Sequence, residues 1–214
     1  PSGKVRFVWD DRFTNLTKKW NHGLSISNPE SKYVMLISDD VMVAQDTIVA
    51  LAEVAGDQRL ILSPGSNCDS TTRFYTQYFA GPVPVPHKCT LQDIEGHESS
   101  VIERPLTHPF LIDPGWISFY CTLFPRTVLN EVGSFDERLD VRYNDADYCQ
   151  RARALGIPSL IHLGCFALHF GDRTLPKCTT EAEYKAADLA YREKYQPLPG
   201  PYDLVIPEDN GDLL

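Results

Sequence analysis

The feature that most constrains this chain is an alternation of short apolar runs and amphipathic segments in its first third. Apolar, β-branched runs lie at 5–11, 32–40 and 59–63, and the first two end in pairs of acids. The segments between them, 14–27 and 46–56, carry apolar residues at helical spacing. Buried strands and helices that alternate in this way predict a sheet with helices on both faces. We therefore expect an α/β fold with a mostly parallel central sheet.

The second half of the chain returns to ordered elements after a long irregular stretch. Residues 64–114 are rich in Gly, Pro, Ser and Thr, and we expect long loops or edge strands there that contribute part of a ligand site. Beyond them the patterns predict a strand at 115–124, helices at 125–133 and 144–156, one or two strands around Gly164, and a helix at 179–195 that opens with the capping box Thr180 and Glu183.

The length of 214 residues fits one ordinary domain. We assign residues 1–195 to this domain and residues 196–214, which are Pro-rich and acidic, to a C-terminal tail or linker. Because the chain opens at Pro1 and not at Met, two interpretations stay open: a trimmed chain, or a piece of a longer polypeptide that carries further domains.

The charge and the cysteines exclude several classes of function. A formal net charge of −9 argues against nucleic acid as a partner. No apolar run approaches the ~20 residues that span a bilayer, so we expect no membrane insertion by this domain. The six cysteines include no C-x-x-C pair, which argues against a thiolate zinc site. Several of them lie inside apolar runs, as free cysteines of a reducing compartment do, and we expect a cytoplasmic protein.

Acidic residues cluster where the predicted strands end and where one predicted helix begins. Ligands of open α/β sheets bind beyond the carboxyl ends of the strands. Any single pair of acids is explained as well by a turn or a helix N-cap, but three clusters together favour a ligand site. The clusters are Asp10 with Asp11, Asp39 with Asp40, and Asp145 with Asp147.

Three segments resemble the GT-A-fold glycosyltransferases, which transfer a sugar from a nucleotide diphosphate. The run YVMLISDDV at 33–41 is similar to the strand that ends in their D-x-D motif. The segment GWISFYCTLFPRTVLNEVGSFDERL at 115–139, followed by YNDADYCQRARALG at 143–156, resembles the acceptor side of the inverting family 2, and ALHFGD at 167–172 resembles its late histidine segment. The resemblance implies a GT-A-like, Rossmann-like single domain.

The resemblance also implies a donor site that holds a divalent cation, Mn²⁺ or Mg²⁺. By position Asp40 is the metal ligand, His169 completes the metal site, and Asp39 contacts the donor; Asp10 and Asp11 correspond to acids that bind the nucleotide base and ribose. Ser38 stands where the family has the first Asp of D-x-D. A carboxylate and an imidazole together suit Mn²⁺. A core histidine remains the alternative for His169, and a cap of the following helix the alternative for Asp10 and Asp11.

On the acceptor side, Asp145 corresponds to the catalytic base of the family. Its place at a helix start keeps a carboxylate ionised at neutral pH, as a base requires. Asn144 replaces the neighbouring Glu of the family motif. Asp147 is expected on the acceptor side, with a capping contact to the Asn144 amide as its favoured role. Trp116 is a candidate to stack on a sugar face, or else a core residue.

Taken together, these features predict a metal-dependent glycosyltransferase with a UDP-sugar as the expected donor and a hydroxyl of a glycan or glycoprotein as the acceptor. Whether the reaction inverts or retains the anomeric configuration stays open. Two alternatives also stay open: a catalytically silent carbohydrate-binding domain, and a sugar-nucleotide nucleotidyltransferase. The second normally carries a glycine-rich basic loop near its N-terminus, and this sequence shows none.

Overall fold

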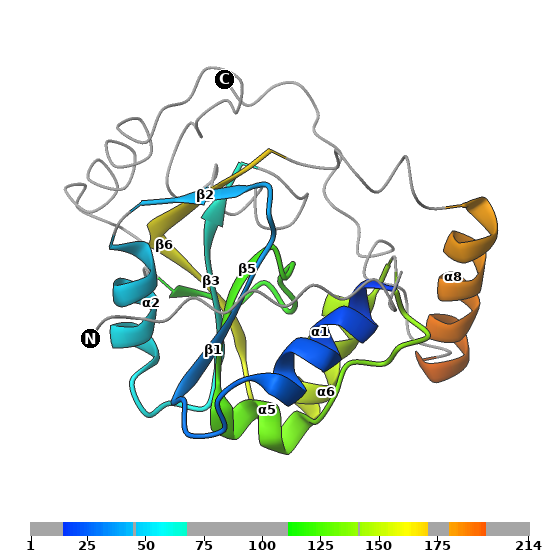
Figure 1. Ribbon diagram of the computed structural model, residues 1–214, viewed down its shortest axis with the longest axis horizontal. Helices are drawn as coiled ribbons and strands as arrows, with labels where there is room; N and C mark the ends of the chain where they lie inside the picture. Colours follow the sequence, from blue (N-terminus) through cyan, green and yellow to red (C-terminus); the bar gives the residue numbers. More distant parts are fainter. Residues whose placement is uncertain (1–14, 45, 68–110, 141, 171–179, 196–214) are drawn as a thin grey trace.

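The computed structural model describes residues 15–44, 46–67, 111–140, 142–170 and 180–195 (Figure 1). The helices are α1 (Leu16–Ile26), α2 (Thr47–Ala55), α5 (Arg126–Val132), α6 (Asn144–Ala154) and α8 (Glu181–Tyr195). The strands are β1 (Tyr33–Ile37), β2 (Val41–Val43), β3 (Ile61–Ser66), β4 (Leu111–Ile112), β5 (Cys121–Pro125) and β6 (Ser159–His169). The predicted first strand with Asp10 and Asp11 and the predicted tail at 196–214 lie outside the described residues.

The chain has the predicted α/β class, but its sheet is mixed. The strand order is β1-β5-β3-β6-β2, and β4 pairs with β6 beside this path. Only the β3–β6 pair is parallel among the described strands; the other four pairs are antiparallel. The expectation of a mostly parallel sheet is therefore wrong. A continuous apolar run predicts a strand that is covered on both faces, and a central strand has this property whichever way its neighbours run.

The long strand β6 organises one half of the sheet. It joins in one element the two segments that flank Gly164 in the sequence. On one edge it pairs with β3, and on the other edge its first half pairs with β4 and its last three residues with β2. The register against β3 shifts between Pro64 and Gly65, which marks an irregularity midway along the pair.

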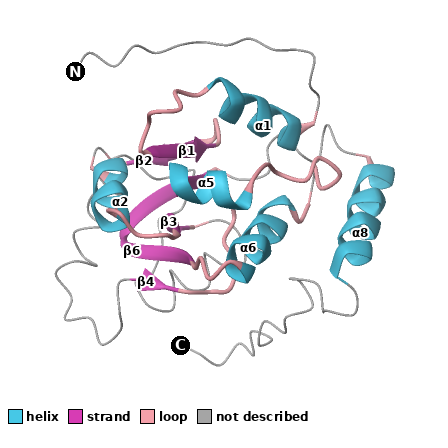
Figure 2. Cartoon of the chain, turned by 90° about the horizontal axis from the view of Figure 1, so that it is seen from below, coloured by secondary structure: helices cyan, strands magenta, loops and turns pink. Residues whose placement is uncertain are grey.

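Side chains that alternate along the strands divide the core between two faces of the sheet. On β3, Ile61 belongs to the larger core cluster and Leu62 to a second one, and Phe124 and Leu123 of β5 divide in the same way. The second cluster contains residues of α2, whereas residues of α1, α5 and α6 join the larger one. Figure 2 shows α2 on one side of the strands and α1 and α6 on the other. Helices thus cover both faces, as the sequence predicts.

Several predicted helix ends agree with the structure. Gly56 follows α2 with φ of 49° and Gly133 follows α5 with φ of 83°, a backbone region that favours glycine. At the start of α8 the Glu183 carboxylate accepts hydrogen bonds from the backbone and hydroxyl of Thr180, so the predicted capping box is confirmed. No helix in the described ranges is long and apolar enough to cross a membrane.

Candidate functional site

The candidate site lies at one edge of the sheet, where three strands end together. Strands β1, β3 and β6 run in the same direction, because β1 and β3 are each antiparallel to β5 and β3 is parallel to β6. Residues 38–40 follow β1, Asn67 follows β3, and His169 closes β6. Tyr120 precedes β5, which enters the sheet at the same edge. This is the edge where α/β sheets bind their ligands.

Asp40 and His169, the two residues expected to hold a metal, are in contact. The distance between His169 Nε2 and Asp40 Oδ1 is 3.1 Å. The backbone brings them together: Val41 pairs with His169 across β2 and β6, and the Phe170 amide donates a 2.9 Å hydrogen bond to the Asp40 carbonyl oxygen. Their side chains are 27% and 17% exposed, so both reach the surface in part.

Two further residues, Asn67 and Tyr120, which no sequence motif marks as functional, hold His169 in position. The Asn67 side chain accepts a hydrogen bond from the His169 amide at 2.9 Å and donates one to the His169 carbonyl oxygen at 3.0 Å. The ring of Tyr120 stacks on the imidazole, with centroids 5.3 Å apart and planes at 18°. Asn67 carries the signal that identified the aspartates, a polar residue directly after a strand, whereas Tyr120 lies in an apolar run that indicates only core.

The donor atoms of Asp40 and His169 fit a shared divalent cation. Two ligands at a right angle around one ion, each at about 2.1 Å, lie about 3 Å apart, which agrees with the 3.1 Å that separates Nε2 from Oδ1. No cluster of three or more His, Cys, Asp or Glu side chains suited to a metal occurs within the described part of the chain. A pair of protein ligands is nevertheless common for a cation whose remaining ligands are water and substrate phosphates.

Of the other candidates on the donor side, the structure describes only Asp39. Asp39 is exposed, in the turn between β1 and β2, next to Asp40. Asp10 and Asp11 lie outside the described residues. The backbone amide of Ser38, the residue at the first position of the D-x-D-like motif, donates a 2.8 Å hydrogen bond to the Tyr120 carbonyl oxygen. Ser38 therefore attaches the acidic turn to the segment that precedes β5.

Asp145, the candidate base, lies half-buried in the first turn of α6. Its carboxylate accepts a 2.7 Å hydrogen bond from the Ala146 amide, and its own amide donates to Asn144 Oδ1 at 2.7 Å. The N-terminal end of a helix dipole favours the ionised form of this carboxylate. Asp145 lies in α6, whereas Asp40 and His169 lie at the ends of strands. Helix α6 packs through Tyr148 and Cys149 against residues 117–119.

Asp147 occupies a buried position that differs from the one we expected. Its side chain is 1% exposed, and Oδ2 accepts a 2.9 Å bond from Arg151 Nε. Oδ1 lies 2.5 Å from Lys194 Nζ and 2.6 Å from the Tyr195 hydroxyl, which donates to it. Burial and this hydrogen bond raise the pKa of Tyr195. The carboxylate thus binds α8 instead of the Asn144 amide, and its burial corrects the placement of Asp147 on an acceptor-binding surface.

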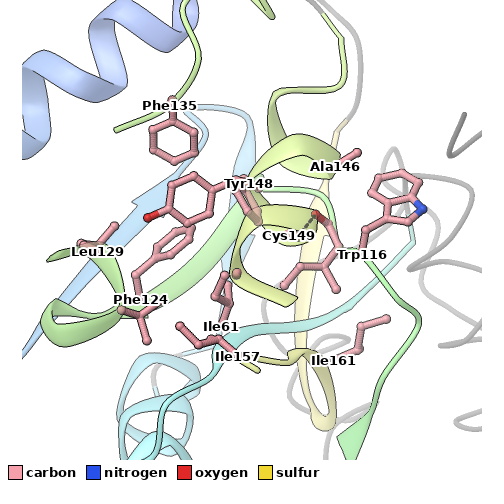
Figure 3. Packing of buried hydrophobic residues seen from close by; sticks show 14 of the residues in the cluster. Ile61, Trp116, Phe124, Leu129, Phe135, Ala146, Tyr148, Cys149, Ile157 and Ile161 are labelled. Atoms are coloured by element: carbon pink, nitrogen blue, oxygen red, sulfur yellow. Dashed lines mark hydrogen bonds between the residues drawn. The ribbon is translucent and has the colours of Figure 1, made fainter. Parts of the chain in front are cut away.

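Trp116 is also buried in this structure. It is 6% exposed and belongs to the larger core cluster, where Figure 3 shows it beside Ala146. Of the two roles considered for Trp116, the structure places it in the core, where its ring does not present an open face to a sugar. The segment around it is not the strand that the sequence predicted from 115 onward, because β5 begins only at Cys121.

Comparison with known proteins assigns no family to this chain. Neither a family model nor a curated protein sequence matches it. The resemblance to family 2 therefore depends on the motifs quoted above, and a functional conclusion depends on the geometry of the Asp40–His169 pair and on the position of Asp145.

Proposed function

We propose that this chain is a metal-dependent glycosyltransferase with a GT-A-like fold that transfers a sugar from a UDP-sugar to a hydroxyl of a glycan or glycoprotein. The observation that carries the proposal is the contact between Asp40 and His169 at the ligand-binding edge of the sheet. These residues lie 129 positions apart (169 − 40) and belong to two separate segments of the family resemblance. Their 3.1 Å separation suits one cation.

In this proposal Asp40 and His169 hold Mn²⁺ or Mg²⁺ beside the donor diphosphate. The cation supplies positive charge that stabilises the diphosphate as it leaves. That charge matters in a chain with a formal net charge of −9, whose acids would otherwise repel a phosphorylated donor. Asp39, exposed in the same turn, is available to a hydroxyl of the donor.

Asp145 accepts the proton of the acceptor hydroxyl. In an inverting reaction the acceptor oxygen forms a bond to the anomeric carbon while the bond from that carbon to the diphosphate oxygen breaks. The electron pair of the broken bond leaves with the nucleotide diphosphate, and the proton passes to Asp145. Asn144 cannot replace Asp145 in this role, because a carboxamide has no basic oxygen at neutral pH.

One observation favours a second candidate, a carbohydrate-binding domain without activity. The side chain of Asn144, which stands where the family has Glu, donates a 2.9 Å hydrogen bond to the Asp140 carbonyl oxygen. Asn144 therefore stabilises the backbone at the start of α6. A binding domain that has lost catalysis would retain such a structural contact and lack turnover.

The test compares Asp145→Asn with Asp40→Asn in three measurements with Mn²⁺ present: binding of UDP, transfer of sugar from UDP-sugars to a glycan acceptor, and release of free sugar. Asp40→Asn is expected to lose Mn²⁺-dependent binding of UDP. Asp145→Asn is expected to keep UDP binding and to lose ~10²–10⁴-fold in transfer. Asp46→Asn is the control for a lost negative charge, because Asp46 is exposed shortly after β2 and has no role in the proposed site. Unchanged Mn²⁺-dependent affinity in Asp40→Asn would show that the metal site is elsewhere, and glycan binding without sugar release by the wild type would favour the binding domain.

A further inference from the structure

Tyr120 contacts three segments that surround the candidate metal site. Its carbonyl oxygen accepts the hydrogen bond from the Ser38 amide, its ring stacks on His169, and its hydroxyl donates a 2.9 Å hydrogen bond to the Pro64 carbonyl oxygen. We propose that Tyr120 is a positioning residue that holds the His169 imidazole toward Asp40. The proposal rests on the proposed function for its metal-binding consequence, but the orientation of the ring is testable without any metal.

The contacts of Tyr120 restrict the orientation of its ring. The residue is 4% exposed. Its hydroxyl is bound to the backbone of β3 at the point where the register against β6 shifts, and its own backbone is bound to the turn that carries Asp40. A ring that is anchored at both ends has little freedom to rotate, so it confines the plane of the imidazole stacked on it.

His169 needs such a device because it lacks the usual one. A metal-binding histidine is normally oriented by a hydrogen bond between its second ring nitrogen and a carboxylate, carbonyl or water. In the described structure His169 Nδ1 is buried and has no hydrogen-bond partner. Asn67 binds only the backbone of His169 and cannot set the side-chain torsions. The second torsion of histidine is broad by itself. Within the described residues, the stack on Tyr120 and the contact with Asp40 are the interactions that orient the ring.

The stack also favours one tautomer indirectly. Without a cation, the 3.1 Å contact is a hydrogen bond that His169 Nε2 donates to Asp40 Oδ1. A cation between the two residues would take the Nε2 lone pair instead, and the ring proton would then be on Nδ1. When no cation is bound and the ring is held in the plane that directs Nε2 to Asp40, the tautomer with the proton on Nε2 gains the hydrogen bond. When the ring is free to turn, the preference for one tautomer weakens.

The first experiment measures Mn²⁺ affinity in the presence of UDP, from the free-Mn²⁺ signal in electron paramagnetic resonance. Tyr120→Leu removes the ring and is expected to weaken Mn²⁺ binding by ~10–100-fold, the range for partners that orient a ligand. Tyr120→Phe keeps the ring and is expected to bind Mn²⁺ within a few-fold of wild type. Tyr148→Leu is the control, because Tyr148 is an equally buried tyrosine in the larger core cluster. Equal losses in Tyr120→Leu and Tyr148→Leu would overturn the proposal, as would wild-type affinity in Tyr120→Leu.

The second experiment uses nuclear magnetic resonance of the His169 ring without metal. In the wild type we expect ring protons shifted upfield by the Tyr120 ring and a single tautomer with the proton on Nε2. Tyr120→Leu should lose the upfield shift and give mixed tautomers, whereas Tyr120→Phe should keep both features. If the wild type binds no Mn²⁺ but shows these signals, the metal proposal fails and the positioning role stands. Unshifted His169 protons in the wild type would refute the positioning role even if Tyr120→Leu does not fold.

Discussion

Asp147→Asn is expected to destabilise the fold more than its conservative size suggests. The substitution keeps the volume of the side chain and removes a charge that is 1% exposed. It leaves Arg151 and Lys194, which are 24% and 26% exposed, without their buried counter-ion. Removal of one partner from a buried ion pair costs ~3–5 kcal/mol. Because both cations reach solvent and Lys194 keeps Asp136 at 3.2 Å, we expect a value at or below the lower limit of this range, about 2–3 kcal/mol.

Urea denaturation followed by circular dichroism measures this loss, since a lower midpoint at constant slope reports a change in stability. Glu181→Gln is the control: Glu181 lies in α8 and forms an i,i+4 pair with Lys185, but the two side chains are 81% and 72% exposed. Exposed pairs of this kind contribute little. A loss of stability in Asp147→Asn no larger than in Glu181→Gln would refute the argument that the buried carboxylate holds α8 against α6.

Three further outcomes are expected. Gly133→Ala should cost about 1–3 kcal/mol in urea unfolding, because φ of 83° with ψ of −160° is a backbone region that essentially only glycine adopts, while no atom lies within 4 Å of the added methyl group. Burial raises the pKa of the Cys121 and Cys149 thiols from 9.0 to about 12. Because the thiolate is the reactive form, both cysteines should react with iodoacetamide at pH 8 ~10³-fold more slowly in the native protein than in urea. Mass spectrometry of the labelled peptides measures this difference. Burial lowers the pKa of His162 below 6.5. The unfolded chain therefore binds a proton at a pH where the folded chain does not, and the free energy of unfolding should fall as the pH drops below about 6.5. His162→Gln should reduce this dependence on pH, as urea midpoints measured from pH 5 to 7.5 would show.

The ends of the helices could be predicted because local chemistry sets them. Gly56 and Gly133 take positive φ values after α2 and α5, and Thr180 with Glu183 closes a capping box within four residues of sequence. The direction of the strands could not be predicted in this way. An apolar run reports burial, and burial is the same for parallel and antiparallel neighbours, so the sequence pattern gave the strands without their pairing.

The same distinction applies to the site. Asp40 and His169 could be selected because each lies at the end of an apolar run, in a segment that resembles a known motif, and the structure brings them into contact. Tyr120 could not, because a tyrosine in the run WISFYCTLF has the pattern of an ordinary core residue. For Asp147 the sequence pattern predicts only a local cap, because its partner Tyr195 lies 48 positions away, beyond the range of any spacing rule.

Tyr143, which precedes Asn144 and Asp145, shows how α8 stabilises the start of α6. Tyr143, at the N-cap of α6, has φ of 64°, the single positive value among the described residues other than glycine. A left-handed backbone costs an ordinary residue ~1–2 kcal/mol. The Tyr143 ring stacks on Tyr191 of α8 with centroids 4.4 Å apart and planes at 18°, and such a pair contributes ~0.5–1.5 kcal/mol beyond the area it buries. The two magnitudes are comparable, so the contact with α8 offsets much of the strain at Tyr143. Because Asp147 also binds α8, two contacts of that helix flank Asp145, and the position of the candidate base depends on α8 as well as on α6 itself.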